Sequence, residues 1–336
     1  MMPLMRNTPA GIALIGCGGM AAHYRATYAH IPGATLRLVV DRDEALAKQV
    51  AEELGATRSS TDWRDALADD IQIADISTPN HLHEEPAVAL LESGRHVILQ
   101  KPMAPTVEAC QRIVDAATRG NAFGAVYMSD LEDPLFWEWR DAIAAGQLGQ
   151  ITGIRARYAH RGGLNPPANS SWRTSKEQTG GGAFIQLSLH HINLACWLLQ
   201  DTVESVMAYS ENLACPHIEG DDTTVCLVRF ARTGVLGVFE SSWNSDGSAF
   251  SIYGTRDSAH CHGTEGATAS GLVTRDVAIP SSSLRGPAGP HNQHRAFVEA
   301  CLRGTPPEVS LADGLRDVAV VQAAYQSAME GRRVSL

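Results

Sequence analysis

The sequence lacks the features that mark several large classes of protein. It contains no run of about 18 apolar residues, so it offers no candidate for a transmembrane helix. Residues 1–9 contain neither the apolar core of a signal peptide nor a twin arginine. Lys and Arg number 27 against 37 Asp and Glu, and the net charge of −10 argues against nucleic acid or an anionic membrane as partner. We therefore expect neither partner.

Cysteine and histidine occur without the spacing of a disulfide framework or a metal centre. The seven cysteines are odd in number and form no CxxC pair, so we expect free buried thiols and a cytoplasmic protein. His81 with His83 and the run 260–262 lack a second ligand group at a recognised zinc spacing, and we expect no metal. His291 and His294, at the start of a predicted helix, are expected at the solvent-exposed surface.

The length and the strand–helix pattern predict two domains. The 336 residues exceed the roughly 250–300 at which a single core stops growing. Apolar strands alternate with helices up to residue 127, which predicts an α/β domain with a doubly wound parallel sheet, a Rossmann domain, over residues 1–127. The expected strands are 12–15, 36–40, 71–76, 96–99 and 123–127, and the expected helices include 44–54, 82–92 and 106–118.

Beyond residue 127 the strands alternate between polar and apolar positions. This period predicts antiparallel strands and an α+β domain with an open, mostly antiparallel sheet over residues 128–336. Residues 263–290 are expected to form loops, with one edge strand at most. The expected strands are 151–160, 203–209, 223–230, 235–241 and 249–253, and the later helices are 183–199, 293–302 and 312–329.

A glycine-rich turn follows the first strand and precedes a helical stretch that ends at Tyr28. Glycine suits a tight turn where the backbone approaches a diphosphate, and the free N–H groups at the helix start then bind the charge. The predicted cofactor contacts in this turn are Gly16, Gly18, Gly19, Met20 and Ala21.

The second strand ends at Asp41, which bears on the choice of cofactor. A carboxylate there accepts hydrogen bonds from the ribose hydroxyls of NAD and repels the 2′-phosphate of NADP. Arg42 beside it could hold that phosphate, so NAD is favoured and NADP stays open.

A triple glycine, residues 180–182, leads into an apolar helix that carries polar groups. At about 100° per residue, Gln186, His190, Asn193 and Trp197 fall within one stripe. Such a stripe lines a site, or else its amides face water and its histidine is a satisfied core residue. The helix alone does not decide between the two.

Several landmarks occur in the order typical of one family. They are the glycine turn with Asp41, Thr78-Pro79-Asn80 with His83, Lys101-Pro102, the GGG helix with His190, and the closing stretch from Asp313-Gly314 through Tyr325 to Val334. Together they cover nearly the whole chain, and in this order the sequence resembles the Gfo/Idh/MocA family of glucose–fructose oxidoreductases and inositol dehydrogenases.

The resemblance implies hydride transfer between a nicotinamide and a hydroxyl carbon of a sugar, cyclitol or sugar acid. It implies that Lys101 orients and polarises the substrate oxygen, that His190 is the acid/base, and that Gln186 stands where the family has an aspartate. In this family the peptide bond corresponding to Lys101–Pro102 is often cis. The resemblance also implies a homodimer or homotetramer that forms through the C-terminal sheet. The further residues it places at the cofactor are Thr78, Asn80, His83, Gln100, Lys101, Trp172 and Arg173, and those at the substrate are His160, Asn193, Lys101 and His190.

The sequence departs from the family at three carboxylates. Gln100 replaces the usual Glu before Lys101, and Gln186 and Asn193 replace Asp residues on the GGG helix. We interpret the changes as an adaptation to an anionic substrate, such as a sugar acid or a nucleotide sugar, which carboxylates would repel.

The lost carboxylates keep two other functions open. Some members of the family use bound NAD transiently to cleave a glycoside with no net redox change. The second of these functions is that of a non-catalytic regulator, which binds a dinucleotide or a sugar. The retained Lys101 and His190 favour the dehydrogenase.

Overall fold

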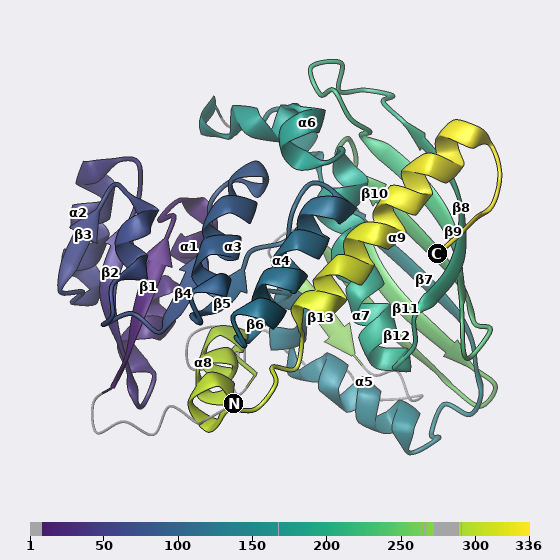
Figure 1. The fold of residues 1–336 in the computed structure, drawn as a ribbon. Helices are drawn as coiled ribbons and strands as arrows, with labels where there is room; N and C mark the ends of the chain where they lie inside the picture. Colours follow the sequence, from purple (N-terminus) through teal and green to yellow (C-terminus); the bar gives the residue numbers. More distant parts are fainter. Residues whose placement is uncertain (1–8, 167, 265–266, 272–288, 290) are drawn as a thin grey trace. The chain divides into compact units, whose positions relative to one another are not determined.

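The computed structural model describes residues 9–166, 168–264, 267–271, 289 and 291–336 (Figure 1). The chain forms two compact units, one from the described parts of residues 1–128 and 286–315, and one from those of 129–285 and 316–336. This division differs from the predicted one, 1–127 and 128–336, because residue 128 and the described part of 286–315 belong to the first unit. Helix α8 (Gln293–Arg303) belongs to the first unit, because Phe297, Val298 and Cys301 lie in that unit's core.

The sheet of the first unit has six strands in the order β3-β2-β1-β4-β5-β6, and all of its neighbouring strands run parallel. This order confirms the predicted doubly wound sheet, with the switch point between β1 and β4. Strand β3 was not predicted, because its three residues include no apolar side chain. The strands are β1 (Ala10–Ile15), β2 (Ala34–Val40), β3 (Arg58–Ser60), β4 (Ile73–Ile76), β5 (His96–Leu99) and β6 (Gly124–Val126).

Some helices of this unit begin where the sequence supplies a side-chain cap. Asp43 accepts hydrogen bonds from the N–H groups of Ala45 and Leu46 at the start of α2, and Thr106 accepts from Ala109 N at the start of α4. The predicted helix up to Tyr28 is α-helical only as far as Tyr24 and then becomes a 3₁₀-helix. The helices are α1 (Gly19–Tyr24), α2 (Glu44–Leu54), α3 (Glu84–Glu92), α4 (Val107–Arg119) and α8.

The second unit contains an eight-stranded sheet in the order β13-β12-β11-β7-β10-β9-β8-β14. Strands β7 and β10 run parallel and the other neighbours antiparallel, which confirms a mostly antiparallel sheet. Of the predicted loop 263–290, residues 265–266, 272–288 and 290 lie outside the described residues. The strands are β7 (Ile151–Ala159), β8 (Val203–Glu211), β9 (Thr223–Phe230), β10 (Leu236–Ser242), β11 (Ser248–Gly254), β12 (Ser258–Thr264), β13 (Ala267–Gly271) and β14 (Val334–Ser335).

The GGG helix packs against this sheet, but it is not a regular α-helix throughout. A π-helical segment (Phe184–Ser188) precedes α7 (Leu189–Leu199), so the stripe drawn at 100° per residue is distorted at Gln186. The helix is also buried on all sides from Ala183 to Cys196. Gln186 and Asn193 are each 2% exposed, which excludes the interpretation that these amides face water. The other helices of this unit are α5 (Pro134–Ala144), α6 (Lys176–Thr179) and α9 (Leu311–Glu330) from Arg316 onward.

Asp221 and Tyr325 hold the start of the GGG helix. The Asp221 carboxylate accepts hydrogen bonds from Gly182 N and Phe184 N, each at 2.9 Å, and from the Tyr325 hydroxyl at 2.8 Å. A Cβ at Gly182 would overlap the backbone of Asp221, and one at Gly181 would overlap the Tyr325 ring. The glycines are therefore required by close packing. Among the described helices, none is both long and apolar enough to cross a membrane.

We predict that Tyr325→Phe lowers the free energy of unfolding by about 1–3 kcal/mol, the cost of leaving buried polar groups unsatisfied. The Tyr325 oxygen accepts from Gly182 N and Ile185 N at 3.2 Å, and both N–H groups lose this partner in the variant. Urea unfolding measures the change. Thr61→Val, which also removes one hydroxyl group, is the control because Thr61 is exposed. Equal effects of the two substitutions would contradict the role given to Tyr325.

Candidate functional site

The chain after β1 packs closely against the ends of the neighbouring strands β2 and β4. Gly16 has φ +91°, and its N–H donates to Val40 O at 2.8 Å. A Cβ at Gly16 would lie 2.8 Å from the carbonyl carbon of Ser77, at the end of β4. Only glycine fits this conformation and this approach, so the turn is built into the switch point of the sheet.

The second half of the turn is open. Gly18 and Gly19 are exposed, and a Cβ built on either would meet nothing within 4 Å. No side chain caps the start of α1. Its backbone N–H groups are thus available to a diphosphate, and the turn fits the NAD predicted for it. Met20 is half-buried at this edge, whereas Ala21 is fully buried in the core.

Asp41 connects the end of β2 to the glycine turn. One carboxylate oxygen accepts from Cys17 N at 2.8 Å and the other from Asp43 N at 3.1 Å. A carboxylate oxygen accepts more than one hydrogen bond, so Asp41 can still receive a ribose hydroxyl. The neighbouring Arg42 is exposed.

His83 braces two loops of the first unit. It is 0% exposed, with Nε2 at 2.8 Å from Thr78 O and Nδ1 at 3.1 Å from Pro102 O. Burial lowers the pKa of His83 and favours the neutral ring. Both ring nitrogens are turned to backbone carbonyls, so His83 positions these two loops. Its predicted contact with the cofactor stays a prediction. Thr78 is half-buried and Asn80 is 2% exposed on the same loop.

Lys101 lies at the carboxyl end of β5, next to β4. The residue is half-buried, and its peptide bond to Pro102 is cis, as the resemblance implied. Gln100 before it is 4% exposed. The chain contains 27 Lys and Arg residues, of which only Lys48, Lys101 and Lys176 are lysines. Lys101 is therefore a rare amine at a ligand-binding edge of the sheet.

In the second unit, Arg173 joins Trp172 to Gln186. Its guanidinium lies over the Trp172 ring, with Cζ 4.5 Å from the centroid, and donates to Gln186 Oε1 at 3.3 Å. Burial lowers the pKa of Arg173, yet a guanidinium stays charged in proteins. Within the described part of the chain, no carboxylate forms an ion pair with it.

His190 shares its surroundings with Tyr158 and His191. The Tyr158 ring lies 5.6 Å from the His190 ring and 5.2 Å from the His191 ring, centroid to centroid. Burial lowers the pKa of His191 to about 3, so this ring is a neutral core residue. His190 is 5% exposed. His160, at the end of β7, accepts from Gly162 N through Nδ1 at 2.9 Å.

Asn193 belongs to a buried polar network. Its Nδ2 donates to Asp317 at 2.6 Å, and Arg316 contacts the other Asp317 oxygen at 2.7 Å. An ionised carboxylate at position 193 could not donate the hydrogen bond that Asn193 Nδ2 gives to Asp317. This contact explains the amide, and the predicted contact of Asn193 with substrate stays a prediction.

The predicted residues thus fall into two sets, one in each unit. The first unit brings together the glycine turn, Asp41 and the loops after β4 and β5, and the second gathers the remainder around the GGG helix. The predicted surface position of His294 was wrong, because this residue is 0% exposed. Asp221 and Tyr325 were missed as supports of the GGG helix, since nothing in the local sequence pairs them.

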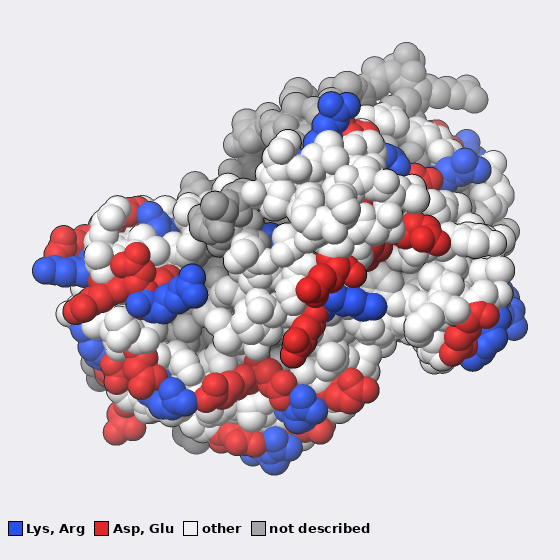
Figure 2. All heavy atoms as spheres, turned by 90° about the horizontal axis from the view of Figure 1, so that it is seen from above, with Lys and Arg blue, Asp and Glu red and all other residues white. Residues whose placement is uncertain are grey.

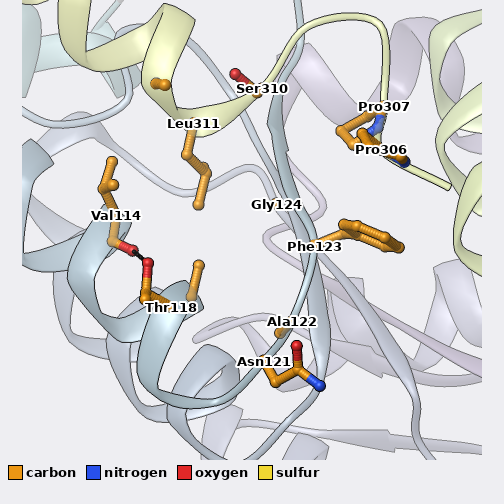
Figure 3. Close-up of a pocket in the computed structure, with 12 residues that line it drawn as sticks. Val114, Thr118, Asn121, Ala122, Phe123, Gly124, Pro306, Pro307, Ser310 and Leu311 are labelled. Atoms are coloured by element: carbon orange, nitrogen blue, oxygen red, sulfur yellow. Dashed lines mark hydrogen bonds between the residues drawn. The ribbon is translucent and has the colours of Figure 1, made fainter. Parts of the chain in front are cut away.

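A hollow in the first unit is not a reactive site. It has a volume of about 350 Å³ and lies between the end of α4 and the segment before α9 (Figure 3). Its lining, which includes Phe123, Pro306 and Leu311, has no ionisable side chain. On the face of the molecule in Figure 2, acidic and basic side chains are interspersed, without a broad area of one sign.

The chain matches two family models and is similar to several known proteins. Residues 10–127 match a family model described as an oxidoreductase family with an NAD-binding Rossmann fold, and residues 136–268 match the GFO/IDH/MocA C-terminal domain. The chain is 29% identical over 289 residues to levoglucosan dehydrogenase of Pseudarthrobacter phenanthrenivorans, covering 76% of this chain and 73% of that protein. It is 29% identical over 332 residues to inositol 2-dehydrogenase 2 of Saccharopolyspora erythraea, covering 95% and 93%.

Solved structures show the same similarity. GenD2 from gentamicin A biosynthesis, in complex with NAD, is 26% identical with a TM-score of 0.83, and the match covers 98% of this chain and 97% of GenD2. The WlbA dehydrogenase of Bordetella pertussis, in complex with NADH and UDP-GlcNAcA, is also 26% identical with a TM-score of 0.83, covering 98% and 99%.

Two glycine substitutions separate folding from cofactor binding. We predict that Gly18→Ala keeps the thermal stability but weakens NAD binding at least about tenfold, or 1.4 kcal/mol, because the methyl group enters the open space above the turn.

Gly16→Ala should lower the melting temperature more than Gly55→Ala does. Gly55 has a positive φ of 69° but open surroundings. Calorimetry and thermal unfolding measure both effects. Unchanged NAD affinity in Gly18→Ala would place the diphosphate elsewhere.

Proposed function

The chain belongs to the Gfo/Idh/MocA family of NAD-binding oxidoreductases, and from that premise we propose that it oxidises a secondary hydroxyl group of a carbohydrate-like substrate. NAD, when bound, supplies the acceptor for the hydride. In this proposal Lys101 binds and polarises the substrate oxygen, and His190 receives the hydroxyl proton.

The position of Lys101 carries the proposal. Ligands of doubly wound sheets bind at the carboxyl ends of the strands, and Lys101 directly follows β5 at that edge. An ammonium group there donates hydrogen bonds to an alcohol oxygen and stabilises the negative charge that develops as the proton leaves. His83 supports this position, since it ties the backbone after Lys101 to the loop after β4.

His190 suits the proton transfer. The nitrogen of a neutral imidazole accepts a proton, and such a transfer is typically worth about 10²–10⁴-fold in rate. The Asp221–Tyr325 pair holds the start of the helix that carries His190, so the ring is placed by a rigid support.

We predict that Lys101→Met and His190→Asn each lower kcat by about 10²–10³-fold, the typical cost of removing a catalytic hydrogen-bonding or proton-transfer group. NAD affinity should stay within about tenfold of the native value, a window of 1.4 kcal/mol. Formation of NADH at 340 nm and calorimetry give the two readouts. Lys48→Met, at an exposed position of α2, is the control. Native turnover in Lys101→Met would refute the role of Lys101.

The substrate that best fits the second unit carries a negative charge. Arg173 is a mostly buried cation whose side-chain hydrogen bond goes to a neutral amide, Gln186. With aspartate at position 186, the guanidinium would be neutralised by its neighbour; with glutamine, its charge is left for a ligand. The bound UDP-GlcNAcA of the WlbA dehydrogenase shows that an acidic sugar nucleotide binds to one relative.

We predict that Gln186→Asp shifts the preference from an acidic sugar toward its neutral parent by at least about tenfold, because the new carboxylate pairs with Arg173. The measurement is the ratio of kcat/KM for a uronic acid to that for the corresponding neutral sugar. Gln326→Asp, at an exposed position of α9, is the control for added charge. The substrate proposal fails if the native protein prefers the neutral sugar, or if Gln186→Asp leaves the ratio unchanged.

We also propose a homodimer or homotetramer through the C-terminal sheet. Neighbouring strands β8, β9 and β10 expose large apolar side chains on one face, a pattern typical of an interface. Light scattering of the purified protein tests this, and a monomer at micromolar concentration would contradict it. The exposed residues are Met207, Tyr209, Val225, Leu227 and Leu236.

A further inference from the structure

The loop between β8 and β9, residues 212–222, is held by hydrogen bonds of its own side chains. The Asp222 carboxylate is 0% exposed and accepts from the N–H groups of residues 213–215, at 2.6–3.0 Å. The Nδ2 atom of Asn212 lies within hydrogen-bonding distance, 2.8–3.0 Å, of three carbonyl oxygens of the same loop. A loop with this many internal bonds is rigid enough to support other segments.

One part of this loop contacts the segment after β7. His217 Nε2 lies 2.8 Å from Gly163 O, and because a carbonyl oxygen only accepts, this nitrogen carries the proton. Gly163 N in turn donates to Trp243 O at 3.0 Å, and Trp243 N donates to Asp222 O at 2.8 Å. The loop therefore supports the segment that begins at His160.

Another part of the loop contacts the segment that carries Arg173. Glu219 N donates to Thr174 O at 2.9 Å, and the Glu219 carboxylate accepts from Lys176 N at 2.9 Å. These two bonds flank Ser175, the N-cap residue of α6, whose own side chain makes no capping hydrogen bond. Glu219 thus caps α6 from a loop more than 40 residues away in the sequence.

Helix α6 connects Arg173 to the GGG helix. Its first residue, Lys176, accepts through its carbonyl oxygen from Gly180 N at 2.8 Å, where the triple glycine begins. Arg173, on the other side of α6, donates to Gln186 Oε1 at 3.3 Å. The position of the guanidinium beside Gln186 therefore depends on where α6 begins, and Glu219 fixes that point.

We propose that Glu219 is a positioning residue for Arg173 and, through it, for the preference for an acidic substrate. This inference rests on the proposed function. Lys176 N needs an acceptor but not a negative charge, so the amide oxygen of a glutamine can replace the carboxylate. Removal of a negative charge by itself would favour an anionic substrate, whereas loss of the cap should disfavour it. The two effects have opposite signs.

The test compares Glu219→Ala with Glu219→Gln, and both variants should fold because Glu219 is exposed. We expect Glu219→Ala to lower the ratio of kcat/KM for a uronic acid to that for its neutral parent sugar about fivefold, the scale of one lost hydrogen bond, and to act through KM more than kcat. Glu219→Gln should keep the ratio within about twofold of the native value, since it retains the acceptor. Glu211→Ala, exposed at the end of β8, is the control for a lost carboxylate and should leave the ratio unchanged. A rise of the ratio in both Glu219 variants would overturn the proposal.

Hydrogen exchange measures the positioning without a substrate. In Glu219→Ala the amides of Lys176 and Ser175 should both exchange at least about fivefold faster than in the native protein, and Glu219→Gln should retain the native rates. The Ser175 amide reports on the turn that carries Arg173, because it donates to Trp172 O at 3.3 Å. Acceleration confined to Lys176 would overturn the positioning role. A native protein without turnover on either sugar would contradict the proposed function, whereas the exchange rates still decide whether Glu219 holds this turn.

Discussion

The close approach of the first and fourth strands at Gly16 is the constraint on which the site depends. No side chain fits between this turn and the backbone at Ser77, so the two strands end side by side and leave the next two glycines open. Asp41 completes the turn from β2 by accepting a hydrogen bond from Cys17 N. The hydroxyl group of Tyr24, the last residue of α1, donates a hydrogen bond to Asp75 and so holds this short helix. The open turn is thus supported from several directions before any ligand is bound.

The three carboxamides that distinguish this chain from its family have three separate physical settings. Asn193 donates to a buried carboxylate at Asp317, whereas neither polar side-chain atom of the buried Gln100 has a hydrogen-bond partner among the described residues. Only Gln186 contacts a cation, Arg173. The idea that all three changes adapt the pocket to an anion is therefore too broad. Asn193 accommodates a carboxylate within its own unit, and in the proposed function Gln186 is the residue that bears on the charge of the substrate.

The parts of the fold that follow from local chemistry were predictable. Helix α2 has the predicted bounds because Asp43 caps its start and Gly55, with φ 69°, ends it. The parallel sheet followed from the alternation of strands and helices. The π-helical segment at 184–188 could not be anticipated, since it leaves the apolar pattern of the helix unchanged. The burial of His294 and the return of α8 to the first unit depend on contacts with residues far away in the sequence. Likewise, Asp221 is more than 30 residues from the glycines that it supports.

The central claim is that the chain transfers a hydride from a sugar hydroxyl to NAD with net reduction of the cofactor. The most direct test is the ratio of NADH to oxidised product, with a panel of uronic acids and their neutral parent sugars. The account predicts one NADH for each oxidised sugar, with the higher kcat/KM on an acid. Product formed without NADH, or NAD bound tightly with no turnover on any member of the panel, would contradict it.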